Sequence, residues 1–306
     1  MGIKEFLQDE GSVRLGQLLG GVLSLKAGRE LAGFVADIMT RRGESGMVQN
    51  IMANQWVVSG GTLSGADLEK QAGKVMRHIT RSLFDYFYFT QHLKEARGLL
   101  EISPRMQEAL RESIEEKKPT ILLGPHLGSF DLFGLMLTRL GLRPYVLSFP
   151  TPNNAYRAQN KLREKSGMLI RPIDFGTYRE AKKLLKEGAC LVTGMDRPIE
   201  EDGEVKYKPL FFGRPASLPV FYVRLAVDTN ATVRVACGMT MPDNRLFMDC
   251  SEPIPFERHG DPAQEYELNA GMVAAAAEKF ILQNPDQWAM FYPVWPEALS
   301  ELHLDH

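Results

Sequence analysis

Cysteine is scarce in this chain of 306 residues, which contains only Cys190, Cys237 and Cys250. Because no two of them are closely spaced, the sequence offers neither a disulfide framework nor a pattern for a zinc site. Two of the three fall in apolar, strand-like runs, and none has neighbours that would make it a nucleophile. We therefore expect buried thiols in a reducing compartment and no metal site.

A strong charge excess of either sign is also missing, since the formal net charge is −2. Nucleic-acid-binding proteins normally carry a marked basic excess, so we expect no nucleic-acid partner. Hydrophobic residues make up 44% of the chain. That proportion, at this length, supports one large globular domain or two modest ones.

Long apolar runs are absent near the start of the chain, as is the pattern of a secretory signal peptide. The uncharged run from Leu15 to Leu25 is about half as long as the roughly 20 residues that a spanning helix needs. Apolar residues then continue at helical spacing to Met39, which predicts an amphipathic helix. Such a helix either packs on the protein's own core or lies on a membrane surface, where Arg14, Lys26 and Arg29 would favour anionic headgroups.

Two patterns divide the remaining sequence. Residues 1–100 show helical periodicity, including a capping-box pattern at residues 64–67 and an aromatic run at residues 84–89 that indicates a buried helix end or a wall for a lipid chain. From residue 118 onward, short apolar strands alternate with helices. We therefore expect an α/β fold with a mixed, mostly parallel sheet flanked by helices (residues 101–306). It is preceded by a helical subdomain (residues 1–100) that either packs on the core or associates with a membrane.

The expected strands lie near residues 120–123, 145–147, 168–172, 189–193, 232–240 and 245–250. The expected helices lie near residues 130–140, 154–166, 177–188, 217–228 and 263–283, with Thr177 predicted to cap the third of them.

The most informative feature is the pair His126 and Asp131, which follows the buried strand at residues 120–123. The histidine lies in the turn between strand and helix, where active sites of α/β proteins gather. Ser129 is placed to cap the helix, and Gly128 lets the chain bend so that Asp131 reaches one ring nitrogen. The other nitrogen would then act as a base on a substrate hydroxyl, since no serine or cysteine nucleophile is evident. The alternative is a histidine merely hydrogen-bonded to backbone.

Further polar groups stand where other strands end. Asp196 and Arg197 follow the strand at residues 189–193, and a charged loop runs from Glu200 to Lys208. The run Gly213-Arg-Pro-Ala-Ser217 is predicted to open a helix, where Arg214 and free N–H groups would meet an anion such as phosphate. Each of these features, taken alone, is also compatible with an ordinary turn.

In order along the chain, these segments resemble the bacterial lipid A biosynthesis acyltransferase family, and more closely its relatives that acylate phosphatidylinositol mannosides. The resemblance covers about residues 45–295. Its motifs are Asn50, His126-x4-Asp131, Arg163, Met168-Leu-Ile-Arg171, Lys186-Glu-Gly188, Gly194-Met-Asp196, Pro209-Leu-Phe-Phe-Gly-Arg-Pro-Ala-Ser217 and Asn284-Pro-Asp-Gln-Trp288.

The resemblance implies transfer of a fatty acyl group from an acyl-CoA or acyl-carrier-protein thioester to a hydroxyl of a membrane glycolipid. It implies no cofactor beyond this co-substrate and a location at the cytoplasmic face of the inner membrane, which we expect to be peripheral. His126 would be the general base, Asp131 its partner, and Arg163, with backbone N–H groups near Gly128, the oxyanion donor. The expected substrate-binding residues are Gly128, Ser129, Arg171, Asp196, Arg197, Glu204 and Arg214.

Two departures favour the phosphatidylinositol mannoside type over a lipid A acceptor. Lipid A transferases usually end the last motif with a histidine and paired arginines, whereas this chain reads Trp288-Ala-Met-Phe-Tyr-Pro-Val-Trp295, and they usually carry an N-terminal membrane span. Two alternatives stay open. One is a lysophosphatidic acid-type glycerolipid acyltransferase, although its Pro-Glu-Gly-Thr motif is missing. The other is a non-catalytic lipid-binding protein on the same fold, which would not need His126 and Asp131 paired.

Overall fold

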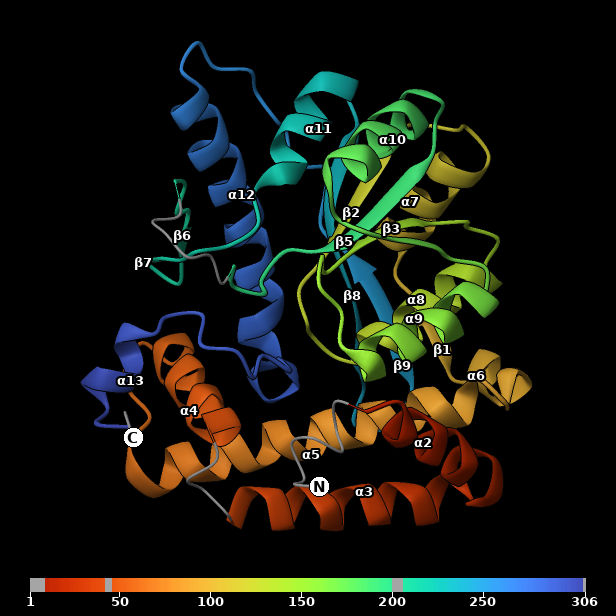
Figure 1. The fold of residues 1–306 in the computed structure, drawn as a ribbon, viewed down its shortest axis with the longest axis vertical. Coiled ribbons are helices and arrows are strands. Elements are labelled where there is room, and N and C mark those ends of the chain that lie inside the picture. Colours follow the sequence, from red (N-terminus) through yellow and green to blue (C-terminus); the bar gives the residue numbers. More distant parts are fainter. Residues whose placement is uncertain (1–8, 42–45, 200–205, 305–306) are drawn as a thin grey trace.

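The computed structural model describes residues 9–41, 46–199 and 206–304. Helices occupy most of the first hundred residues, as the periodicity predicts (Figure 1). Their bounds are α2 (Glu10–Val22), α3 (Leu25–Arg41), α4 (Gly46–Val58), α5 (Gly65–Phe89) and α6 (Leu93–Gly98).

A seven-stranded sheet forms the centre of the molecule, in the order β1-β9-β8-β2-β5-β3-β4. Strands β8, β2, β5, β3 and β4 run parallel, whereas β9 is antiparallel to β8 and pairs in parallel with β1. The strands are β1 (Leu100–Ile102), β2 (Thr120–Gly124), β3 (Tyr145–Ser148), β4 (Leu169–Pro172), β5 (Cys190–Gly194), β8 (Thr232–Thr240) and β9 (Leu246–Cys250). A separate two-stranded ribbon joins β6 (Leu210–Phe211) to β7 (Arg214–Pro215).

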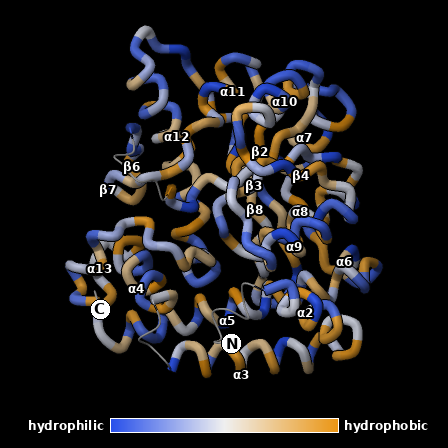
Figure 2. The backbone as a smooth tube through the Cα atoms, viewed as in Figure 1, coloured by the Kyte–Doolittle hydropathy of each residue, from blue (hydrophilic) through white to orange (hydrophobic). Residues whose placement is uncertain are grey.

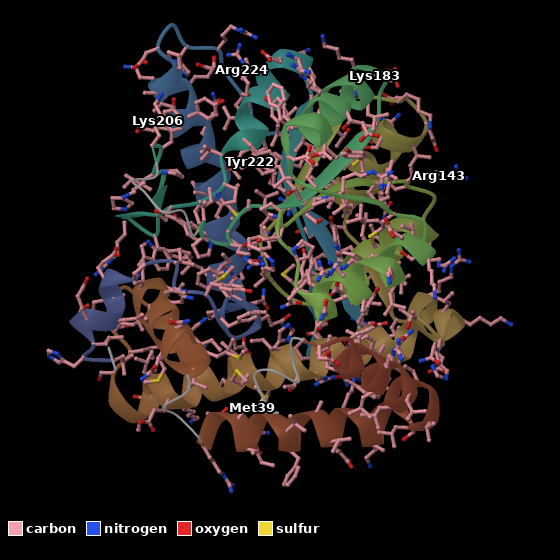
Figure 3. All side chains as sticks on the ribbon, viewed as in Figure 1. Met39, Arg143, Lys183, Lys206, Tyr222 and Arg224 are labelled. Carbon is pink, nitrogen blue, oxygen red and sulfur yellow. The ribbon has the colours of Figure 1, made fainter. Side chains whose placement is uncertain are left out.

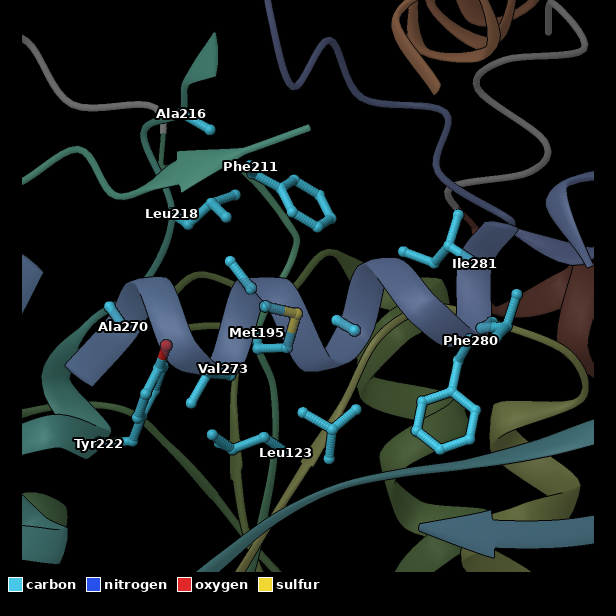
Figure 4. Packing of buried hydrophobic residues seen from close by; sticks show 14 of the residues in the cluster. Leu123, Met195, Phe211, Ala216, Leu218, Tyr222, Ala270, Val273, Phe280 and Ile281 are labelled. Atoms are coloured by element: carbon cyan, nitrogen blue, oxygen red, sulfur yellow. The ribbon is translucent and has the colours of Figure 1, made fainter. Parts of the chain in front are cut away.

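Helices cover both faces of the sheet. They are α7 (Pro104–Ile114), α8 (Phe130–Arg139), α9 (Asn154–Lys165), α10 (Phe175–Lys186), α11 (Phe221–Thr229) and α12 (Pro262–Gln283). Beyond the 3₁₀ turn η1 (Pro285–Gln287), α13 (Glu297–Glu301) packs against α4. Strand β2 shows how the layers form, because its side chains alternate between faces. Ile121 and Leu123 enter the cluster beneath α10, α11 and α12, part of which Figure 4 shows, whereas Leu122 joins the cluster on the opposite face.

The N-terminal helices share their core with the sheet domain through α5. The aromatic run at its carboxyl end, Phe84 to Phe89, is buried. Its aromatic side chains lie in the same hydrophobic cluster as Leu132 of α8. Burial of the run, predicted from its all-round hydrophobicity, is therefore confirmed. In the sheet domain, Figure 3 shows the aromatic side chain of Tyr222 in the interior, between α11 and α12. The charged side chains of Arg143 and Lys183 lie at the periphery.

The predicted α/β class, with a mostly parallel mixed sheet and N-terminal helices, is confirmed, and so is the burial of the three free cysteines. Three local predictions are wrong. The helix expected from residue 217 begins at Phe221. Ser64 starts α5 without a side-chain cap, and α10 is capped by a capping box between Asp174 and Thr177, so that Thr177 is not the N-cap itself.

Helices α2 and α3 each bury one face and expose apolar side chains on another. Val13, Ala32 and Ala36 are buried. The exposed apolar residues are Leu15, Leu18, Val22, Leu31, Phe34, Val35 and Ile38. Figure 2 shows hydrophobic segments alternating with hydrophilic ones along α3, at the edge of the molecule. Within the described ranges, no helix combines the length and apolar content that crossing a bilayer would require.

Candidate active site

The loop between β2 and α8 holds His126 at the carboxyl edge of the sheet, as the sequence predicts. Gly128 bends this loop with a φ of +66°, a conformation that favours glycine. A Cβ atom at this position would lie 2.1 Å from the carbonyl oxygen of Gly238. Glycine is therefore required here for close packing of the loop on β8, in addition to its backbone freedom.

The imidazole of His126 pairs with Asp196, and not with Asp131. Its Nδ1 lies 2.6 Å from Oδ1 of Asp196, and the backbone N–H of His126 donates to Oδ2 at 2.8 Å. Asp196 is 0% exposed, whereas the His126 side chain is 29% exposed. A buried carboxylate thus fixes one ring nitrogen, while Nε2 has no hydrogen-bond partner among the described residues.

Parallel pairing of β2 and β5 explains why Asp196 reaches the histidine. Gly124 and Gly194 are register partners at the ends of these strands. His126 and Asp196 each lie two residues further along the chain, so both stand at the same edge of the sheet. Gly194 also leaves room for the ring, because a Cβ on it would lie 3.2 Å from Cε1 of His126. Asp196 was predicted from its place at a strand end to bind substrate, but the pairing of the two strands was not visible in the sequence.

Asp131 faces the neighbouring helix α9. Its Oδ1 accepts a hydrogen bond from Nε of Arg163 at 2.7 Å, and its Oδ2 accepts one from Gln159 at 2.6 Å. The Asp131 and Arg163 side chains are only 11% and 12% exposed. The first turn of α8 directs the carboxylate away from the loop, so the predicted contact with His126 is wrong. The pair instead fixes α8 to α9.

The predicted oxyanion donors are already engaged. The N–H groups of Leu127, Gly128 and Ser129 donate to the carbonyls of Pro125, Gln287 and Gly238. Arg163 donates to Asp131 and also, through Nη1, to Asn160 at 2.8 Å. Ser129 does not cap α8, because its hydroxyl contacts Ser82 and Thr240 instead. The N–H groups of Phe130 and Asp131 are left without an acceptor among the described residues.

Arg197 follows Asp196 directly in sequence, and its guanidinium lies between two aromatic rings. Its guanidinium carbon is 3.7 Å from the ring centroid of Phe149 and 4.1 Å from that of Tyr292. Two aromatic faces therefore hold the planar group, and no carboxylate of the described residues pairs with it. An arginine so held is suited to bind an anionic or hydroxyl-bearing substrate through its N–H edge.

The other predicted binding residues lie apart from this centre. Arg171, on β4, donates to the carbonyl of Ile170 and is 3.9 Å from Glu164. Arg214 lies on β7 and pairs with Glu301 at 2.6 Å, so the expected anion site at a helix start is wrong. Glu204 falls outside the described residues.

The segment from Asn284 to Tyr292 contributes contacts that the sequence analysis missed. Nε1 of Trp288 donates to Oδ2 of Asp196 at 2.7 Å, and the N–H of Ala289 donates to the carbonyl of His126 at 2.7 Å. The motif ending in Trp288 was visible in the sequence, but nothing in it indicated which carboxylate the indole would reach.

Nucleophiles other than a substrate hydroxyl have little support here. Burial raises the pKa of the Cys190 thiol to about 12 and that of Cys250 to about 11, which disfavours the reactive thiolate. Among the described residues, no group of three or more His, Cys, Asp or Glu side chains is arranged to hold a metal ion. The site as a whole presents the imidazole of His126, oriented by Asp196, in the loop between β2 and α8.

Comparison with known proteins identifies a family and similar curated proteins. The family described as bacterial lipid A biosynthesis acyltransferase matches residues 101–297. The chain is also similar to proteins named phosphatidylinositol mannoside acyltransferase from two strains of Mycobacterium tuberculosis, ATCC 25618 / H37Rv and CDC 1551 / Oshkosh, with 28% identity over 196 residues in each. That similarity covers 59% of this chain and 56% of each relative, so the chain spans little more than half the length of these curated proteins.

Proposed function

This chain belongs to the bacterial lipid A biosynthesis acyltransferase family, and from that premise we propose that it is an O-acyltransferase. It moves a fatty acyl group from an acyl-CoA or acyl-carrier-protein thioester to a hydroxyl of a membrane glycolipid. The observation that carries the proposal is the buried Asp196 on Nδ1 of His126, with Nε2 left for substrate. The names of the two mycobacterial relatives support a glycolipid acceptor.

The reaction needs no covalent acyl-enzyme. His126 Nε2 takes the proton of the acceptor hydroxyl as its oxygen attacks the thioester carbonyl. Asp196 stabilises the imidazolium that forms. The C–S bond of the tetrahedral intermediate then breaks, and the departing thiolate takes the proton from His126. An ester and a free thiol result.

The negative charge on the intermediate oxygen needs donors that are not already engaged. The N–H groups of Phe130 and Asp131, in the first turn of α8, begin four residues after His126 and meet this requirement. The positive end of the helix dipole adds to them. Arg163 then supports the site indirectly, by holding Asp131 and α8 in place.

Arg197 is the group best placed to bind the acceptor. Its position next to Asp196 and between two aromatic rings supports contact with a phosphate or hydroxyl group of the glycolipid headgroup. The exposed apolar residues of α2 and α3 support peripheral association with the cytoplasmic face of the inner membrane, where a membrane acceptor would lie. Arg29, grouped with the basic residues of this region in the sequence, instead donates to Asp85 at 2.8 Å.

The two alternatives differ from this proposal in one feature each. A lysophosphatidic acid-type enzyme would accept a lipid without sugar, so a panel of lysophospholipids and glycolipids separates the two. A non-catalytic lipid-binding protein would not need a buried carboxylate on His126.

The test is acyl transfer by purified protein, with mass spectrometry of a glycolipid extract incubated with a palmitoyl thioester. The mass increment identifies the acyl group, and the parent lipid identifies the acceptor. His126→Ala should lower turnover about 10²–10⁴-fold, whereas His303→Asn, at an exposed histidine near the end of α13, should not. A folded His126→Ala protein with more than about a tenth of the native turnover would remove His126 as the base.

A further inference from the structure

Trp288 is the second side-chain partner of the carboxylate that orients His126. Its indole N–H donates to Oδ2 of Asp196 at 2.7 Å, and both side chains are fully buried. We infer that Trp288 is a positioning residue, which fixes the rotation and the charge of Asp196 and through it the basicity of His126. This inference rests on the proposed function for its kinetic consequences, but its first test does not need turnover.

The three hydrogen bonds on Asp196 divide between its two oxygens. Oδ2 accepts from the backbone N–H of His126 and from Trp288, which leaves Oδ1 for Nδ1 of the imidazole. Because donors on Oδ2 come from two directions, the carboxylate plane has little freedom to turn. The indole N–H can only donate a hydrogen bond, so Oδ2 of Asp196 must be the acceptor.

The same segment holds the histidine backbone. The N–H of Ala289 donates to the carbonyl of His126 at 2.7 Å, and the carbonyl of Gln287 accepts from Gly128 at 2.9 Å. Leu127 and Trp288 form an antiparallel bridge. Residues 287–289 therefore hold the main chain around His126 and the side chain of Asp196, and so fix the base and its carboxylate partner relative to each other.

Helix α4 holds this segment from the other side. Asn50 donates to the carbonyl of Phe291 at 3.0 Å, Asn54 to those of Met290 and Tyr292 at 3.0 and 2.8 Å, and Gln55 to that of Pro285 at 2.8 Å. These amides satisfy carbonyls that would otherwise be costly to bury. Trp288 thus belongs to a segment that is fixed on both sides.

A chemical consequence follows from the donor on Oδ2. A hydrogen bond to a carboxylate stabilises its charge and reduces its tendency to hold a proton. Without the indole N–H, Asp196 becomes the stronger acceptor for Nδ1–H, and the imidazolium form of His126 is favoured. Trp288→Phe should therefore favour the protonated form of His126, while it leaves an aromatic ring in the core.

Trp295 provides a matched control in the same cluster. It is 0% exposed, its ring centroid lies 6.3 Å from that of Trp288, and its indole nitrogen is buried without a hydrogen-bond partner among the described residues. Trp295→Phe removes a similar volume from the same aromatic core but no hydrogen bond. Any effect of the cavity alone should therefore appear in both variants.

The first experiment is an NMR titration of the ¹⁵N-labelled imidazole of His126 in the full chain. In Trp288→Phe the titration of His126 should move to higher pH by about one unit, and the Nδ1–H resonance should shift. Trp295→Phe should titrate like the native protein. Equal titrations in both variants would overturn the inference, whatever the activity of the protein.

The second experiment is the pH–rate profile of acyl transfer. The acidic limb of kcat/KM reports the pKa of the free base, so it should move to higher pH in Trp288→Phe alone. Because Asp196 loses one of the two donors that fix its rotation, and with it the orientation of the imidazole, the plateau of kcat should fall about tenfold with little change in KM. An unmoved limb in Trp288→Phe, in a protein whose His126→Ala variant is inactive, would contradict the inference and leave the proposed function standing. Activity in His126→Ala would instead contradict the proposed function.

Discussion

At the scale of single residues, the site depends on which of two carboxylates reaches His126. Asp131 is five residues away in sequence but pairs with Arg163, whereas Asp196 follows another strand and forms the hydrogen bond to Nδ1. Sequence spacing identified the histidine, its loop and both acids. It did not identify the pairing, because that depends on the register between β2 and β5 and on the direction of the first turn of α8.

Asp196→Asn and Asp131→Asn should therefore fail in different ways. In Asp196→Asn, the oxygen of the new amide faces Trp288 and the backbone N–H of His126, so its NH₂ group is directed at Nδ1. The ring must then carry its proton on Nε2, which removes the base, and we expect turnover to fall about 10³–10⁴-fold. Steady-state kinetics measures this loss.

Asp131→Asn keeps the tautomer of His126 but leaves the buried Arg163 guanidinium without a counter-charge. We expect a loss of about 3 kcal/mol in the free energy of unfolding, measured by urea denaturation, and a smaller loss of turnover. If Asp131→Asn were the variant with the larger catalytic defect and the smaller loss of stability, the assignment of the two carboxylates would be reversed.

At the scale of elements, strands were more predictable from sequence than the starts of helices. The apolar runs of β2, β5 and β8 are buried on both faces and are therefore nearly continuous in sequence. The short β1 and the polar α7 were missed. The start of α11 was placed too early, because the run from Gly213 to Ser217 was interpreted as a helix opening when Arg214 and Pro215 belong to a small antiparallel ribbon.

Helix α5 connects the N-terminal helices to the loop of His126 through a second histidine. Nε2 of His78 lies 3.0 Å from the hydroxyl of Ser82, which in turn accepts a hydrogen bond from Ser129. Burial lowers the pKa of His78 below its ordinary value of 6.5, although its hydrogen bond with the backbone of Gly128 opposes that shift. Folding therefore favours the neutral form of this side chain.

The stability of the protein should consequently fall in mildly acidic solution. Below about pH 6.5 the unfolded chain binds a proton at His78 that the folded chain resists, so the free energy of unfolding decreases as pH falls toward the lowered pKa. His78→Gln should lack this contribution. We expect the difference in unfolding free energy between native protein and variant to be smaller at about pH 5.5 than at about pH 7.5. An equal difference at both values would show that His78 does not titrate differently in the two states.

At the scale of the whole molecule, the consecutive helices α2 and α3 expose apolar side chains to solvent. Phe34 is 64% exposed, and Leu18, on the neighbouring helix, is 62% exposed. Another large exposed ring, Phe175 at 72%, lies at the start of α10 in the sheet domain. Isolated exposed apolar residues are ordinary, but a series of them on consecutive helices favours contact with lipid.

Sedimentation with liposomes tests this surface. The native protein should bind vesicles that contain anionic lipid, and high salt should weaken the binding by screening its electrostatic part. Phe34→Ser combined with Leu18→Ser should weaken binding at least about tenfold, because each buried apolar side chain contributes about 1.5–3 kcal/mol. Phe175→Ser should have no effect. Equal binding by both variants would assign membrane contact to another surface.

The amides of α4 set a limit on how this protein can be divided. The part that matches the family begins at residue 101, yet Asn50, Asn54 and Gln55 donate to carbonyls between Pro285 and Tyr292. A fragment cut at residue 101 would keep His126, Asp196 and Trp288 while losing the donors that fix the segment behind them. A fragment that keeps the site intact therefore has to include α4. In a hybrid enzyme whose N-terminal helices come from another protein, the side chains of Asn50, Asn54 and Gln55 have to be retained.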